Sequence, residues 1–128
     1  MGLDNYWTPN GAAWDSEPTI AIDFEPPLQL GPSGDLFDDG WFRGKRYNPL
    51  VETLTGISLY TKIIHNHTVH EMADTLAAVT YKEAIDQYQR APVATGTPNP
   101  DITRREYTDL QRMFCAYADA GAQLEAWY

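Results

Sequence analysis

The stretch DITRREYTDLQRMFCAYADAGAQLEAWY, residues 101–128, decides what kind of fold this sequence can form. Asp101 or Thr103 is suited to cap a helix, and Glu106 follows Thr103 at the spacing of a capping box. Gly121 is suited to end that helix, because glycine readily adopts the left-handed conformation. Residues 124–128 then read as a final strand or a docked tail. One broad apolar stripe of the helix is formed by Tyr107, Leu110, Met113, Phe114, Tyr117 and Ala118.

A second helical stretch lies earlier, at residues 68–90. Thr68 and Glu71 have the spacing of a capping box and predict its start. Two apolar stripes follow, and at about 100° per residue they point in nearly opposite directions. We therefore expect a break near Thr80, where Thr80 and Glu83 form another capping box, or a helix with a partner on each side. The stripes are Met72, Leu76 and Val79, and then Tyr81, Ile85 and Tyr88.

Residues 1–45 differ in character, because prolines and glycines recur there and disfavour helix. Residues 3–7 read as one strand. Residues 19–24 read as a better one, with Ile20, Ile22 and Phe24 on one face at period two.

From residue 46 onward the chain reads as mainly helical. Asn48 and Pro49 predict the start of a short helix and Gly56 its end, while residues 57–64 alternate as a strand does. The sequence thus predicts a single α+β domain over residues 1–128. In it a small, mostly antiparallel sheet from the N-terminal part packs against about three helices.

The composition excludes several classes of protein. The net charge is −9 and the pI about 4.5, which argues against nucleic acid or an anionic membrane as a partner. No apolar run is near the ~18 residues that a membrane span needs. The start of the chain lacks the basic and apolar parts of a signal peptide, so we expect a cytoplasmic protein. The acidic, lysine-poor balance fits either a high-salt cytoplasm or a coding bias.

All three histidines lie within six residues, at His65, His67 and His70. On an extended segment His65 and His67 face the same side, and three imidazoles so close are a candidate Zn²⁺ site with one position open for water. In the alternative interpretation the histidines bind no metal and each has its own local position in the structure. His65 then ends a strand, His67 precedes a helix cap and His70 lies exposed in the first helical turn.

Residues 34–47 form the other unusual patch, in which three basic residues stand beside aspartates and aromatics. The patch matches neither a calcium loop nor a phosphate-binding loop. It is suited to present Arg and Trp side chains to a partner or ligand. On the alternative reading, the aromatics belong to the core and the charges are solvated. The candidate binding residues are Asp38, Asp39, Trp41, Arg43, Lys45 and Arg46.

Signals for catalysis are few. Cys115 is the only thiol, and its place beside an apolar helical stripe is typical of a small buried side chain. Arg104, Arg105 and Arg112 form a basic patch on the last expected helix. In so acidic a chain we expect it to pair with nearby carboxylates rather than with phosphate.

The opening residues 1–6, Met-Gly-Leu-Asp-Asn-Tyr, resemble the start of small uncharacterised proteins of phage, prophage and haloarchaeal genomes, which begin Met-Gly-Leu-Asp-x-Tyr. Residues 42–52, Phe-Arg-Gly-Lys-Arg-Tyr-Asn-Pro-Leu-Val-Glu, are similar to the haloarchaeal members, and the phage members have an aromatic-Arg-Lys segment that leads into a helix. The resemblance implies no activity. It implies a mobile-element or archaeal origin.

These observations favour a small, acidic, non-enzymatic binding or regulatory protein. Its partner is another protein or a second copy of itself, and it needs no cofactor. The alternative is a zinc-binding protein or a metal-dependent hydrolase that uses His65, His67 and His70.

Overall fold

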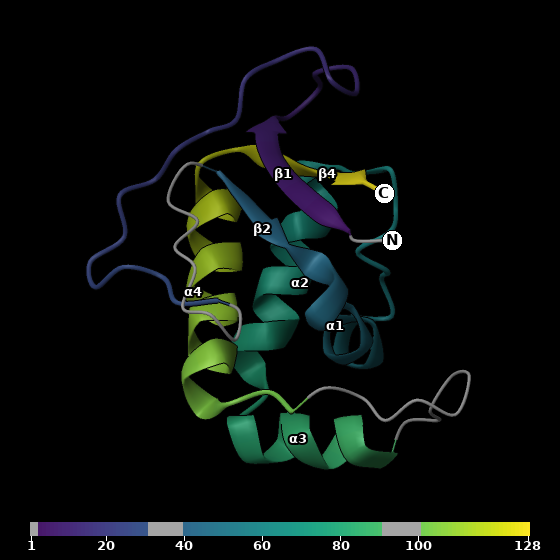
Figure 1. Ribbon diagram of the computed structural model, residues 1–128, viewed down its shortest axis with the longest axis vertical. Coiled ribbons are helices and arrows are strands. Elements are labelled where there is room, and N and C mark those ends of the chain that lie inside the picture. The colour runs from purple at the N-terminus through teal and green to yellow at the C-terminus, as the bar shows by residue number, and fades with distance from the viewer. Residues whose placement is uncertain (1–2, 31–39, 91–100) are drawn as a thin grey trace.

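The computed structural model describes residues 3–30, 40–90 and 101–128 (Figure 1). The fold is α+β, as predicted: a four-stranded antiparallel sheet packs against helices. In chain order the elements are β1 (Asp4–Pro9), β2 (Trp41–Arg43), the 3₁₀ turn η1 (Gly44–Arg46), α1 (Asn48–Thr55), β3 (Ile63–Ile64), α2 (Asn66–Ala78), α3 (Tyr81–Arg90), α4 (Arg104–Asp119) and β4 (Ala122–Trp127).

The two ends of the chain form the centre of the sheet. The strand order is β2-β1-β4-β3, and β1 pairs with β4 along its whole length, from Asp4 opposite Trp127 to Pro9 opposite Ala122. The N- and C-termini therefore lie close together (Figure 1). Strands β3 and β4 come from outside the N-terminal part, so the sheet is assembled from the whole chain.

Two predicted strands differ from the structure. Residues 19–24 form no strand, because β1 already has β2 on one side and β4 on the other. One backbone hydrogen bond links this segment to β1, from Ile20 N–H to the Trp7 carbonyl at 2.8 Å. Of residues 57–64, only Ile63 and Ile64 are in a strand, and a turn precedes them.

Helix starts are shifted by side chains that bond elsewhere. Asn48 is the first residue of α1 rather than its cap, and its Oδ1 accepts from Leu59 N–H at 2.7 Å. Helix α2 begins at Asn66, two residues before the expected Thr68 cap. The Asn66 amide donates to the carbonyls of Ala118 and Ala122 at 3.1 and 2.8 Å, so this start is fixed by the end of α4.

The break near Thr80 is confirmed. Helix α2 ends at Ala78 and α3 begins at Tyr81, with the Thr80 hydroxyl accepting from Glu83 N–H at 3.2 Å. The two helices then bury different faces. Met72 and Leu76 of α2 and Tyr88 of α3 are buried, and α3 lies at the end of the molecule away from the sheet (Figure 1).

The core is centred on Trp7 of β1 and on α4. The Trp7 ring is fully buried, lies parallel to Tyr117 at a centroid distance of 4.7 Å and meets Phe114 edge-on at 5.2 Å. The predicted capping box of Thr103 and Glu106 starts α4, and Gly121 follows the helix with φ of 76°. The apolar stripe predicted for this helix is buried throughout.

In the described part of the chain, no helix is both long and apolar enough to cross a membrane.

We expect Phe114→Ala to lower the free energy of unfolding by about 3–5 kcal/mol, because it leaves a cavity against Trp7. Thr108→Ala, at an exposed position of the same helix, is the control and is expected to change it by less than about 0.5 kcal/mol. Urea denaturation followed by circular dichroism measures both. Equal effects of the two substitutions would contradict this packing.

Candidate functional site

The predicted binding residues that the structure describes belong to two consecutive elements. Trp41 and Arg43 belong to β2, at alternate positions that point away from the helices, while Lys45 and Arg46 belong to η1. Lys45 is exposed. Asp38 and Asp39 lie outside the described residues.

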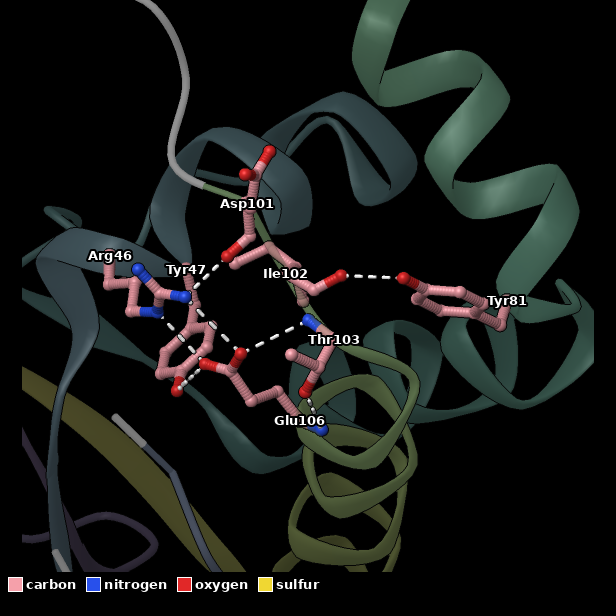
Figure 2. Close-up of polar contacts among 7 residues, drawn as sticks. All are labelled: Arg46, Tyr47, Tyr81, Asp101, Ile102, Thr103 and Glu106. Carbon is pink, nitrogen blue, oxygen red and sulfur yellow. Dashed lines mark hydrogen bonds and ion pairs between the residues drawn. The ribbon is translucent and has the colours of Figure 1, made fainter. Parts of the chain in front are cut away.

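Arg46 is held by an ion pair within the molecule (Figure 2). Its Nε donates to Glu106 Oε2 at 2.8 Å, and its Nη2 donates to Glu106 Oε1 at 3.2 Å and to the Asp101 carbonyl. The Tyr47 hydroxyl donates to Glu106 Oε2 at 2.6 Å. The alternative reading of this segment, in which its charges are solvated, is therefore wrong for Arg46, because this side chain joins η1 to the start of α4.

The Glu106 carboxylate is stabilised in its ionised form. Burial opposes ionisation, but the hydrogen bonds from Arg46, Tyr47 and Thr103 N–H outweigh it and lower the pKa of Glu106 to about 2. The same bonds raise the pKa of Arg46 against the effect of burial. The group is fully occupied by partners within the chain, which makes it a structural anchor.

Phe42 and Tyr47 are fully buried, as the alternative reading of this segment expects. Trp41 is partly exposed, and it belongs to a different arrangement. On the outer face of the sheet, the face turned away from the helices, four rings lie next to one another from β2 to the edge beyond β4. We call this set, Trp41, Tyr6, Trp127 and Trp14, the aromatic row.

Strand pairing and ring contacts define the row. Tyr6 is opposite Trp41 in the register, with ring centroids 6.2 Å apart and planes 23° apart. Tyr6 also meets Trp127 edge-on at 5.6 Å, and Trp14 stacks on Trp127 at 4.3 Å. All four side chains are partly exposed. Aromatic side chains in such positions supply large contact area at low entropic cost.

A buried polar network fixes the loop that carries Trp14. Glu125 on the outer face of β4 is only 1% exposed, and it accepts from the Thr8 hydroxyl at 2.7 Å and from Asp15 N–H at 3.0 Å. Gln123 bonds Gly11 N–H and the Ala12 carbonyl. The Trp14 Nε1 donates to the Ala126 carbonyl at 3.2 Å. The loop therefore holds Trp14 in place beside Trp127.

The charges at the row are mixed. Asp4 is the register partner of both Arg43 and Trp127, so the acidic side chain lies on the outer face of the sheet between these two residues. Lys62 lies over the Trp14 ring, with Nζ 4.9 Å from the centroid. Asp15 and Glu17 are exposed on the loop after Trp14.

The three histidines do not converge in the structure. His65, His67 and His70 are all exposed at the start of α2, and the rings of His65 and His67 lie nearly parallel with centroids 6.5 Å apart. Among the described residues, no group of three or more His, Cys, Asp or Glu side chains is placed to hold a metal ion. The arrangement resembles the local alternative more closely than a metal centre.

The remaining candidates, Cys115 and the arginines of α4, interact with neighbouring residues of the same chain. Burial, with Asp119 and Asp74 adding to it, raises the pKa of the Cys115 thiol, which makes it a poor nucleophile near neutral pH. Arg105 and Arg112 both pair with Asp109, at 3.3 and 2.9 Å, as expected for an internally neutralised patch.

Sequence reasoning found Trp41 but missed Tyr6, Trp14 and Trp127. For Tyr6 a signal was present, because it alternates with the buried Trp7 along β1 and must point to the opposite face. Trp127 alternates in the same way along β4. Their meeting depends on the pairing of the two chain ends, which no local pattern shows.

Comparison of this chain with protein-family models, with curated proteins and with solved structures finds no match.

The low pKa of Glu106 predicts a pH dependence of stability. Ionised Glu106 stabilises the fold fully above its ordinary pKa of 4.5, and this contribution is lost as the pH falls towards 2. Between pH 6 and pH 2, wild type should lose about 2–3 kcal/mol more of its unfolding free energy than Glu106→Gln. Urea titrations at each pH measure this. Glu71→Gln, at an exposed site on α2, should follow wild type, and parallel curves for wild type and Glu106→Gln would refute the anchor role.

Proposed function

We propose that this chain is a small, acidic, non-enzymatic binding protein, and that it works by protein–protein contact through the aromatic row. The observation that carries the proposal is the row itself: Trp41, Tyr6, Trp127 and Trp14 lie in mutual contact on the outer face of the sheet and remain partly exposed. Aromatic side chains that stay partly exposed next to one another are typical of interaction sites, and Trp and Tyr are among the residues most enriched in interface hot spots.

Rigidity supports a binding role. Trp14 is hydrogen-bonded to the β4 backbone, and its loop is tied to Gln123 and Glu125. Strand β2 continues into η1, where Arg46 is fixed to Glu106. A surface that is already ordered loses less conformational entropy on association, so more of its contact energy appears as affinity.

The proposal covers two kinds of partner, another protein or a second copy of the chain. It also includes a viral or archaeal mobile-element origin and a cytoplasmic location. The zinc alternative at His65, His67 and His70 also stays a prediction. Metal analysis of the purified protein tests it: one equivalent of zinc, lost in His67→Ala, would favour the alternative over the binding proposal.

The proposal predicts that variants of the row lose contacts while keeping the fold. Tyr6→Thr and Trp41→Thr retain a residue that favours strands, so both variants should stay folded, with melting temperatures lowered only by the lost ring contacts. Their association with partner proteins in cross-linked extracts of the native host, or their self-association in sedimentation velocity, should fall at least about tenfold, as expected for hot-spot residues.

Ile85→Ala is the matched control, since Ile85 is a partly exposed apolar residue on α3, away from the sheet. It should behave as wild type in both assays. If the row variants stay folded and neither assay distinguishes them from Ile85→Ala, the proposed function is wrong.

A further inference from the structure

The turn that follows β1 begins with Asn10 and Gly11, an asparagine directly before a glycine, and both residues are exposed. Because glycine has no side chain, its backbone nitrogen is unhindered and can reach the side-chain amide of the residue before it. We infer that this pair is a modification site, at which Asn10 converts through a cyclic imide to aspartate or isoaspartate in the folded protein, assisted by the start of α2. The inference goes beyond the proposed function and does not depend on it.

The reaction needs only water and hydroxide. Hydroxide removes the N–H proton of Gly11, and the nitrogen attacks Cγ of Asn10, which forms a tetrahedral carbon with negative charge on Oδ1. The bond from Cγ to Nδ2 then breaks, and Nδ2 takes a proton from water and leaves as ammonia. Water opens the resulting five-membered imide at one of its two carbonyl groups, and the two openings give aspartate and isoaspartate.

The structure places a hydrogen-bond donor on the oxygen that becomes charged. Asn10 Oδ1 accepts from Asn66 N–H at 2.8 Å. Asn66 is the first residue of α2, so this oxygen lies at the positive end of a helix of 13 residues. The Asn66 side chain donates to the Ala118 and Ala122 carbonyls, which holds the donor in position. A donor fixed at the atom on which charge develops lowers the barrier, as in an oxyanion hole.

A hydrogen bond to Gln123 restrains the attacking nitrogen. Gly11 N–H donates to Gln123 Oε1 at 3.1 Å, and Gln123 Nε2 donates to the Ala12 carbonyl at 2.9 Å. The nitrogen must leave this acceptor before it can turn towards Cγ of Asn10. Because the turn is exposed, such local opening costs little free energy. Gln123 therefore slows the reaction without preventing it.

The other asparagines of the sequence are poorer sites. Asn48 and Asn99 precede prolines, which have no N–H proton to lose. Asn5 is fully buried, and Asn66 lies in a helix with its amide bonded to two carbonyls. The modification should therefore be selective for Asn10.

Mass spectrometry of the whole protein, aged in mildly alkaline buffer and then digested, follows the reaction. Chymotrypsin cuts after Trp7 and Trp14 and releases residues 8–14, in which Asn10 is the sole side-chain amide. This peptide should gain the mass difference between an amide and a carboxylate and separate into two products. Asn5 and Asn66, in other peptides, should convert at least about tenfold more slowly, because their surroundings must open first.

Two variants at one position isolate the backbone donor. Asn66→Pro and Asn66→Ala both lose the side-chain bonds to Ala118 and Ala122, but only proline also lacks the N–H. Proline suits the first position of a helix, and His65 before it has φ of −70° and ψ of 159°, as residues before proline do. Asn10 should convert at least about fivefold more slowly in Asn66→Pro than in Asn66→Ala.

The variant Asn10→Asp provides a second measurement, which does not depend on the folding of the proline variant. Its carboxylate lies at the positive end of α2, so its melting temperature should equal or exceed that of wild type. A clear fall in that temperature would overturn the contact with Asn66 N–H on which the inference rests.

Two rate measurements would also overturn the inference. Conversion of Asn10 no faster than that of Asn66 would show that the turn is not a modification site. Equal rates in the two Asn66 variants, or a faster rate in the proline variant, would show that the start of α2 does not assist. Neither result bears on the proposed function, which the association of the row variants decides.

Discussion

Strand β1 pairs with β4 in an antiparallel register that runs from Asp4 opposite Trp127 to Pro9 opposite Ala122, and both faces of the molecule depend on it. Because side chains alternate along a strand, this register turns Trp7 towards Phe114 and Tyr117 of α4 and turns Tyr6 towards Trp41 and Trp127. A slip of one residue would exchange the two faces and bury the wrong ring. The core and the candidate site are thus two results of one pairing, and a change in the strands affects both.

A second constraint links the edge of the sheet to the helices. Gly44 at the start of η1 lies so close to Asn5 that an added Cβ would be 1.8 Å from Asn5 Oδ1, so a larger residue would displace the buried Asn5 side chain. Two residues later, Arg46 reaches Glu106 at the first turn of α4. Strand β2, which carries Trp41, is therefore held between β1 and α4 although it has only three residues. The short edge strand keeps its place through these contacts rather than through a long ladder of backbone bonds.

The sequence predicted features that depend on near neighbours. The capping box of Thr103 and Glu106 and the break before Tyr81 follow from spacings of three residues and from the phase of apolar side chains, and both are confirmed. Features that depend on contacts between residues far apart in the sequence could not be predicted from local patterns. Arg46 looked like a free surface charge because its partner, Glu106, lies sixty positions further along. Residues 19–24 alternate as a strand does, but alternation does not show whether a sheet edge is available. Tyr6 and Trp127 meet only after the chain ends have paired.

The proposed site divides affinity and selectivity between different parts of the chain. Long-range attraction comes from an acidic molecule whose first 42 residues carry no positive charge, and such attraction mainly raises the rate of encounter and depends on salt. It does not distinguish one cationic partner from another. Discrimination requires contacts that form only with a matching surface, and in the proposed function the partly exposed rings of the aromatic row would make them. Arg43 is the register partner of Asp4, and Lys62 lies over Trp14, so the outer face carries charges of both signs next to the rings. Such a pattern favours a partner whose own charges are arranged to match it and disfavours one whose charges are not.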